Sequence, residues 1–574
     1  MRTVLILAKK PKKKYLIELK NKYHSKITDI LPLSLDIKIF LYRNNFENIL
    51  STTKFFGNNN HKLSLKITNS FRSFIRENIE KIDTDLNSYT SFSTWISNIV
   101  IFRYFNNFLF KFLVIKNLIK NNNYDRYIFY GFQSQLLIDY VQKNQKSNNL
   151  IFLDSNQRKN KVFIFSKFLK FINNLFLVAY SKLEYIDIED SIILSSINYN
   201  FLNLKSKKKI IYLSEEGISL FNLIKIKFKH NIYTKFLSIY SYKSKKEYLN
   251  QILDKDKNNE YKFNFFKKCL FEIKNEINDE IYNLEIKFLN FKRLTKKSSP
   301  HLFISPFSFG LSGLISESFN KDHINSFCIP HGTCKGNPSN KYEYLYNLEI
   351  AEGIIKNNFK FISIQSKYSE TACDYFNPKI KKVYTGPICF SKKSFTSINK
   401  NNFLYASTFK SPKNTKFFGV ETYDEYLETL SDLIKLFSNL DYNLIIQPHP
   451  TLLSYINFES LKKFLKIKTN NIYLSEKSFH ENLEISNVLI SYSSTTLEES
   501  LLSHKPVIIY DKWNRYNHMS DIITKNSYEI NYFNNLKDMR DKLKIIYKNS
   551  IVYQGIDINL KKHYKHQYIE KYID

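Results

Sequence analysis

A histidine enclosed by two prolines stands directly after an apolar run in the last third of the chain. The segment reads Gln447-Pro-His-Pro450 and follows residues 443–446, in a chain of 574 residues that holds only 12 prolines and 12 histidines. Proline on both sides stiffens the backbone and biases it away from helix, which would hold the imidazole at the carboxyl end of a strand. Ligands bind at that edge of open α/β sheets, so we predict that His449 and Pro450 bind a ligand.

A group of hydroxyl residues follows a second apolar run farther along the chain. Ser491-Tyr-Ser-Ser-Thr-Thr496 comes after residues 488–490, and residues 495–502 continue with helical spacing. Hydroxyls and unpaired backbone N–H groups at a helix N-terminus form an anion site. The pattern predicts a phosphate-binding group made of Ser493, Ser494 and Thr495, facing the same crevice as His449.

Two further segments in the first 385 residues end apolar runs in residues that could transfer a proton. Residues 210–213 lead into Ser214-Glu-Glu-Gly217, and a carboxylate such as Glu215 or Glu216 can accept a proton from an attacking hydroxyl. An acidic cap on an ordinary helix is the structural alternative, which the helix dipole also favours.

The second such segment is Phe327-Cys-Ile-Pro-His-Gly-Thr333, an apolar run that ends in a histidine before a glycine. His331 could act as an acid or base there. A hydrogen-bonded structural histidine in a loop is the alternative.

Charge and composition limit the classes of partner. Lys and Arg number 86 and Asp and Glu 53, a formal net charge of +33, yet the abundant Lys, Asn, Ile, Phe and Tyr all have AT-rich codons that could supply the excess. No nucleic-acid-binding motif accompanies the charge. We therefore expect no nucleic-acid partner, and we expect anionic substrates or an anionic membrane surface instead.

The location and redox state follow from the cysteines and the N-terminus. Five cysteines are too few for a disulfide framework, and Cys328 and Cys334 do not have zinc-site spacing. The apolar part of residues 1–8 is too short for a signal peptide, and no window is long and apolar enough to span a membrane. We expect a cytoplasmic protein, peripheral at the inner face of the cell membrane.

Short apolar runs that end in turn or cap residues recur along the chain, which predicts an α/β fold with parallel strands. The expected strands are 3–7, 127–130, 150–153, 192–194, 210–213, 302–305, 327–329, 361–364, 403–406, 444–447, 472–474, 488–491 and 507–510, and residues 423–437 are an expected helix. A length of 574 residues needs more than one core. Two Rossmann-like domains, 1–385 and 386–574, are the economical division.

Three stretches are expected to be helical. Residues 243–297 are charged, have helical period and lack glycine and proline, so they form either a helical insertion or long solvated helices, and the second is favoured. Residues 101–113 and 162–172 combine aromatic residues with lysines. Core helices with outward lysines are favoured there over interfacial membrane helices.

The C-terminal half resembles the nucleotide-binding domain of GT-B glycosyltransferases, particularly the bacterial capsule and lipopolysaccharide enzymes. The resemblance is firm over roughly residues 380–515, patchy over 205–340 and absent before about 200, and it is carried by Val383-Tyr-Thr-Gly-Pro387, Gln447–Pro450, Leu489–Ser500 and Lys505–Asp511. It implies a GT-B fold with two Rossmann-like domains facing a central cleft. It further implies a site without metal or cofactor, donor contacts at Gly386 and a ribose contact at Glu498.

Two activities share this donor half. In bacterial sialyltransferases of the fold, an HP motif and a later serine motif bind CMP, and Glu215-Glu216-Gly217 looks like the acidic motif whose first carboxylate is the general base. This resemblance implies transfer of a sialic or related nonulosonic acid from a CMP-linked donor to a glycan or lipid-linked acceptor. The donor in either case is CMP- or CDP-linked.

The alternative enzyme is a CDP-glycerol-type glycerophosphotransferase, because His331-Gly-Thr333 looks like the catalytic segment of that family. Cys334-Lys335 departs from the Pro-Leu-Lys that usually follows there. A non-catalytic polysaccharide- or membrane-binding protein on a GT-B scaffold is the remaining alternative.

Overall fold

The computed structural model describes residues 2–22, 27–79, 100–121, 124–132, 134–145, 149–153, 176–177, 187–196, 206–215, 220–237, 247–249, 261–296, 298–388, 401–409, 421–453, 456–520 and 529–552. Glu216 and residues 162–172 lie outside these ranges, as does part of 243–297.

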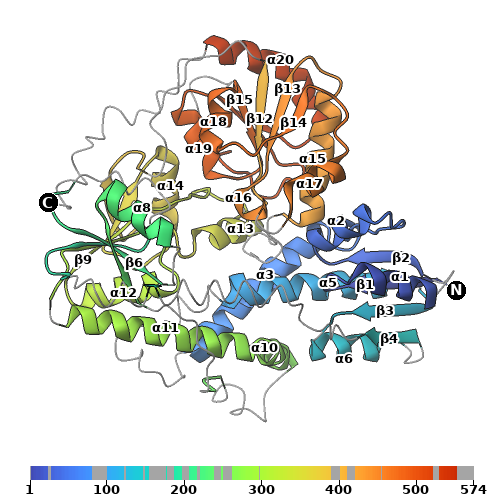
Figure 1. Ribbon diagram of the computed structural model, residues 1–574, viewed down its shortest axis with the longest axis horizontal. Coiled ribbons are helices and arrows are strands. Elements are labelled where there is room, and N and C mark those ends of the chain that lie inside the picture. Colours follow the sequence, from blue (N-terminus) through green and yellow to red (C-terminus); the bar gives the residue numbers. More distant parts are fainter. Residues whose placement is uncertain are drawn as a thin grey trace.

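The described strands form three sheets, and every paired strand is parallel (Figure 1). The first has the order β2-β1-β3-β4, with β1 Thr3–Leu7, β2 Ile27–Pro32, β3 Arg126–Tyr130 and β4 Leu150–Leu153. The second has the order β11-β10-β9-β8-β5-β6-β7, with β5 Ile192–Leu194, β6 Ile210–Ser214, β7 Tyr233–Phe236, β8 Leu302–Ser305, β9 Asn325–Cys328, β10 Phe361–Ile364 and β11 Lys381–Tyr384. The third has the order β14-β13-β12-β15-β16-β17, with β12 Asn402–Ala406, β13 Asn443–Gln447, β14 Ile472–Leu474, β15 Val488–Ser491, β16 Val507–Tyr510 and β17 Ile530–Phe533.

The second and third sheets have Rossmann strand order. Numbered in chain order within the sheet, the third reads 3-2-1-4-5-6, and the second reads the same way with a seventh strand added. The predicted α/β fold class with two Rossmann-like domains is therefore confirmed. The first sheet is separate from these two. Its strands lie within the range 1–385, which the sequence suggested was one domain, and a separate sheet was not expected there.

Helices connect and cover the strands. They are α1 Lys13–Lys22, α2 Leu35–Arg43, α3 Asn58–Ile79, α5 Asn106–Asn121, α6 Gln135–Asn144, α8 Leu220–His230, α10 Tyr261–Glu272, α11 Lys274–Thr295, α12 Leu311–Lys321, α13 Lys341–Ala351, α14 Lys367–Phe376, α15 Tyr423–Phe437, α16 Pro450–Leu453, α17 Phe458–Leu465, α18 Phe479–Glu484, α19 Thr495–Leu502 and α20 Leu536–Val552. The expected helix at 423–437 is confirmed with the same bounds as α15.

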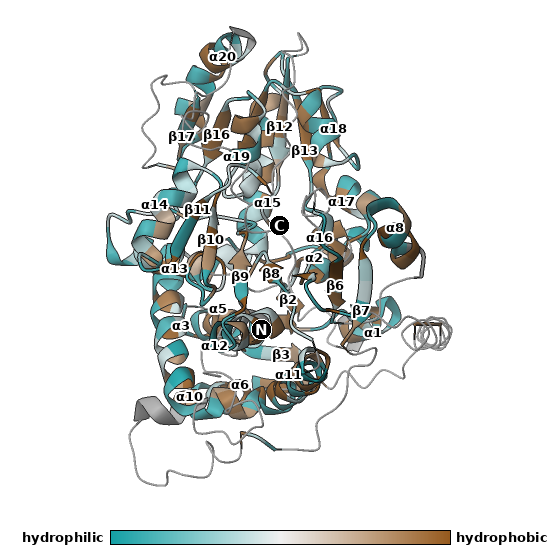
Figure 2. Cartoon of the chain, turned by 90° about the vertical axis from the view of Figure 1, so that its left-hand side faces the viewer, coloured by the Kyte–Doolittle hydropathy of each residue, from teal (hydrophilic) through white to brown (hydrophobic). Residues whose placement is uncertain are grey.

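The strand cores are continuous runs of Val, Ile and Leu because helices cover both faces of a parallel sheet. Figure 2 shows these strands as brown segments inside the molecule. All thirteen expected strands are present, some with ends shifted by one or two residues. The four strands that the sequence analysis missed, β2, β7, β11 and β17, all lie at sheet edges and carry polar or charged residues.

The expected core helices are confirmed for residues 101–113, where a π-helical turn, Ile101–Phe105, leads into α5. Phe105 and Leu109 are fully buried there, and Phe105 stacks on Phe71 of α3 at 3.8 Å between ring centroids. In the charged stretch that precedes residue 297, α11 buries Ile281 and Phe288 on one face, so this helix packs on the core rather than being solvated all round.

Buried charges join the first sheet's helices to the third sheet. Asp424 at the start of α15 accepts hydrogen bonds from the N–H and hydroxyl of Thr52 at 2.6 and 2.7 Å. The neighbouring Glu425 contacts His61 of α3 at 3.1 Å and accepts two bonds from Arg515. Burial alone would raise the pKa of Glu425, but His61 and Arg515 outweigh it and hold that pKa well below its usual range.

Candidate functional site

His331 lies in the loop that follows β9, at the carboxyl edge of the second sheet. Its Nδ1 is 3.2 Å from the carbonyl oxygen of Pro306, which follows the neighbouring strand β8. Because a carbonyl oxygen only accepts, Nδ1 carries the proton, and in the neutral ring Nε2 carries the lone pair. His331 is thus set up as a proton acceptor through Nε2.

His449 follows β13 at the carboxyl edge of the third sheet and has the opposite tautomer. Its Nδ1 accepts a hydrogen bond from the backbone N–H of Thr451 at 3.1 Å, so the neutral ring carries its proton on Nε2. The prolines do not keep the backbone out of helix here, because α16 begins at Pro450. A proline in the first turn lacks only an N–H that would have no acceptor within the helix.

The cluster of serine and threonine residues after β15 lies at the start of α19, as the sequence predicts. Ser494 is the N-cap residue in extended conformation, and its side chain accepts the N–H of Thr496 at 3.2 Å. Ser493, Ser494 and Thr495 are half-buried. The positive end of the helix dipole and the first-turn N–H groups point towards this place, which suits an anion.

The carboxyl edges of the second and third sheets meet at this point. A methyl group built on Gly332 would lie 3.4 Å from Cγ2 of Thr495, so the histidine loop touches the first turn of α19. One turn later, the hydroxyl of Ser366, the N-cap residue of α14, donates to Glu498 at 2.8 Å. The structure thus brings three sequence-predicted residues, His331, Thr495 and Glu498, into one region.

Glu498 has a raised pKa. Its side chain is buried, and desolvation raises its pKa to about 7 although the bond from Ser366 opposes the shift. Its Oε1 has no hydrogen-bond partner among the described residues. Other buried oxygens at or just after strand ends also have no partner among the described residues, including Oγ1 of Thr333, Oγ1 of Thr496 and Oε1 of Gln447.

Gln365 connects the histidine loop to the start of the domain linker. Its side-chain amide donates to the carbonyl of Pro330 at 2.6 Å, and its carbonyl accepts the N–H of Ile388 at 3.0 Å. Gly386 lies just before, with a φ of +66° that other residues adopt at a cost. Gln365 and Ser366 were not among the residues expected at the site, although both follow an apolar run, as His331 and His449 do.

Glu215 lies farther along the same edge of the second sheet. It follows β6, and its carboxylate is 3.5 Å from Nζ of Lys287 on α11. Three strand spacings separate β6 from β9 in the sheet order, so Glu215 and His331 are about 14 Å apart along the edge. The structure therefore places His331, and not Glu215, next to α19.

Within the described residues, no three His, Cys, Asp or Glu side chains gather so as to hold a metal ion. Of the described helices, none is long and apolar enough to cross a membrane.

Comparisons with known proteins give distant structural likeness. No family model matches the sequence, and no curated protein sequence matches it. The wall teichoic acid polymerase TagF matches with 12% identity over 72% of this chain and 98% of its own, with a TM-score of 0.33. UDP-GlcNAc 2-epimerase from Neisseria meningitidis matches with 10% identity over 67% and 98%, with a TM-score of 0.38. TarM matches with 14% identity over 51% of this chain, which spans 57% of TarM's length, with a TM-score of 0.32. These values by themselves assign no activity to the chain.

Proposed function

We propose that the chain is a transferase of surface-glycan biosynthesis that takes a group from a CMP- or CDP-activated donor and passes it to a hydroxyl of a glycan or lipid-linked acceptor. The observation that carries the proposal is the meeting of two predicted half-sites from different sheets. The histidine loop after β9 lies against the N-terminus of α19, because a methyl group placed on Gly332 would be 3.4 Å from Cγ2 of Thr495. Rossmann sheets bind their ligands at this edge.

The donor side supplies hydrogen bonds to a phosphate. In its neutral form His449 carries its proton on Nε2, and the hydroxyls of Ser493 and Thr495 lie at the positive N-terminal end of α19. These donors would strengthen their bonds as negative charge builds on the departing CMP, which lowers the barrier to its release. Glu498 and the oxygens of Gln447 and Thr496 that have no partner among the described residues are candidate contacts for the hydroxyls and amino group of the nucleotide.

In the first form of the reaction the donor is a CMP-sugar, of the sialic or related nonulosonic acid type. The acceptor oxygen bonds to the anomeric carbon, its proton passes to a base, and the bond from that carbon to the phosphate oxygen breaks. Glu215 or Glu216 is the base by resemblance. Lys287 beside Glu215 places a positive charge that would orient this carboxylate.

The second form, glycerol-phosphate transfer from CDP-glycerol, is favoured by the position and tautomer of His331. Here the acceptor hydroxyl attacks the outer phosphorus, the bond to the oxygen of the inner phosphate breaks, and CMP leaves. The Pro306 carbonyl fixes the proton on Nδ1 of His331, so the lone pair on Nε2 would take the proton of the acceptor hydroxyl.

Substitution of the two bases separates these forms. CMP release is measured with CMP-N-acetylneuraminic acid and with CDP-glycerol, for wild type, Glu215→Gln and His331→Ala, with His480→Ala on α18 as a half-exposed control. Loss of a general base costs about 10²- to 10⁴-fold in rate. Loss only in Glu215→Gln supports sugar transfer, and loss only in His331→Ala supports phosphotransfer. Wild type that releases CMP from neither donor contradicts the proposal.

A further inference from the structure

Helix α8, which contacts the edge strand β7 of the second sheet, carries an exposed apolar stripe. Phe228 is 85% exposed and Ile224 46%, and they are four residues apart, so they lie on one face. The other face of α8 is anchored, since Leu223 and Ile226 are buried. No other large apolar side chain in the described ranges is as exposed as Phe228.

Lysines flank this stripe on both sides. Lys225 and Lys229 are exposed, and Lys227 extends to the other side, where its Nζ lies 4.1 Å from the ring centre of Tyr233. Burial, and then the charges of Lys229 and Lys225, lower the pKa of the adjacent His230. Figure 2 shows α8 at the side of the molecule with hydrophobic and hydrophilic segments alternating along it.

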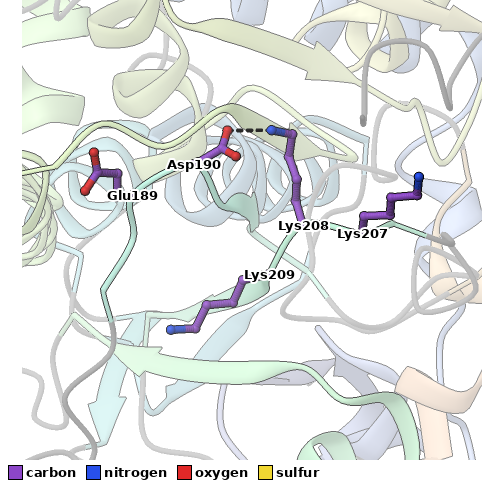
Figure 3. A pocket seen from close by; sticks show the side chains of 5 residues that line it. All are labelled: Glu189, Asp190, Lys207, Lys208 and Lys209. Carbon is purple, nitrogen blue, oxygen red and sulfur yellow. Dashed lines mark hydrogen bonds and ion pairs between the residues drawn. The ribbon is translucent and has the colours of Figure 1, made fainter.

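The basic surface continues from α8 to the amino ends of β5 and β6. Lys209 lies 4.7 Å from the same Tyr233 ring, and it lines a pocket of about 420 Å³ with Lys207, Lys208, Glu189 and Asp190 (Figure 3). Asp190 is paired with Lys208 at 2.5 Å. The two carboxylates offset part of the charge in the pocket, so the lysines of α8 form the stronger positive surface.

We propose that α8 docks on an anionic lipid bilayer, with Phe228 and Ile224 entering the boundary between headgroups and acyl chains and with Lys225, Lys227 and Lys229 contacting lipid phosphates. Exposed aromatic and aliphatic side chains enclosed by lysines on one amphipathic helix are the chemistry of an interfacial membrane contact. A second copy of this chain fits less well, because a symmetric contact would oppose these lysines to their own copies. The contact is separate from residues 101–113, which are core.

Docking through α8 would decide which domain meets a lipid-linked acceptor. α8 follows β6 and the acidic segment at Glu215, so docking through α8 holds the second Rossmann domain at the membrane surface. An acceptor carried on a lipid would then be delivered to this domain, while the third sheet would bind a soluble nucleotide donor.

Flotation of the full chain with vesicles tests the proposal without any nucleotide, so its outcome is independent of transfer activity. Vesicles of phosphatidylcholine alone are compared with vesicles that contain about a third phosphatidylglycerol. Wild type should float only with the anionic vesicles, and added salt should weaken binding. Phe228→Ser should reduce the partition coefficient about 10- to 100-fold, and Lys225→Gln with Lys229→Gln about 25-fold.

Phe271→Ser is the matched control, because Phe271 is 65% exposed and belongs to α10, which is well separated from α8 in Figures 1 and 2. It should leave flotation unchanged, and all variants should keep the wild-type melting temperature. Equal losses in Phe228→Ser and Phe271→Ser would overturn the proposal, as would binding that is indifferent to lipid charge. Wild type that sediments as a dimer and becomes monomeric in Phe228→Ser would assign the stripe to a second copy instead.

Discussion

Replacing Glu498 with glutamine should make the protein more stable, and increasingly so as the pH rises. Burial raises the pKa of Glu498 from 4.5 to about 7, so the folded state holds its proton more tightly than the unfolded state. A carboxyl group shifted in this direction contributes no penalty below pH 4.5, a growing penalty between pH 4.5 and 7, and a constant one above. A shift of this size corresponds to about 3 kcal/mol.

Glutamine keeps an oxygen for the hydroxyl of Ser366 and cannot ionise, so it removes the penalty. Urea unfolding of wild type and Glu498→Gln at pH 5, 6, 7 and 8 should give free energies that differ by about 1 kcal/mol at pH 5 and about 3 kcal/mol at pH 8, in favour of glutamine. Glu499→Gln, whose carboxylate faces His480 at 3.5 Å, is the control on the same helix. Parallel pH curves for wild type and Glu498→Gln would refute the reasoning.

Three further substitutions test other parts of the structure. Arg72→Met leaves the buried carboxylate of Glu349 without the guanidinium that it contacts at 2.6 Å, and should lower the free energy of unfolding in urea by about 3–5 kcal/mol. Adding Glu349→Leu should restore most of that stability. Gly386→Ala places a side chain at φ +66° and should cost about 1–2 kcal/mol, read as a lower melting temperature. Gln365→Leu leaves the Pro330 carbonyl without its donor and should lower the free energy of unfolding by about 1–3 kcal/mol. Because it loosens the histidine loop and not α19, it should lower turnover more than nucleotide affinity. An equal loss of turnover and affinity would contradict this role.

The buried strands, and the strand ends at which ligands bind, could be predicted from the sequence. A central parallel strand must be apolar on both faces, so its pattern is unambiguous, and the polar residue that follows it, as with His331, His449 or Ser494, marks the edge. Edge strands such as β7 and β11 are more exposed to solvent and tolerate Lys and Thr, so they do not appear in the sequence as apolar runs.

Contacts between residues far apart in the chain could not be predicted from the sequence pattern. The bond from Ser366 to Glu498 joins residues 132 positions apart, and the ion pair of Glu215 with Lys287 joins the end of β6 to a residue of α11 more than 70 positions later in the chain. The separation of Glu215 from His331 follows from strand order, which apolar runs alone do not fix. Glu216 lies outside the described residues, and its role stays a prediction.

The most direct test of the central claim is nucleotide binding at His449 and α19. Isothermal titration calorimetry is run with CMP, CDP, UDP and GDP on wild type, His449→Ala and the control His480→Ala. Loss of one hydrogen bond to a charged phosphate costs about 1.5–3 kcal/mol, or roughly 10- to 100-fold in affinity. We predict that CMP or CDP binds wild type and His480→Ala alike and His449→Ala at least tenfold more weakly; binding of UDP alone, or cytidine-nucleotide binding that His449→Ala leaves unchanged, would contradict the account.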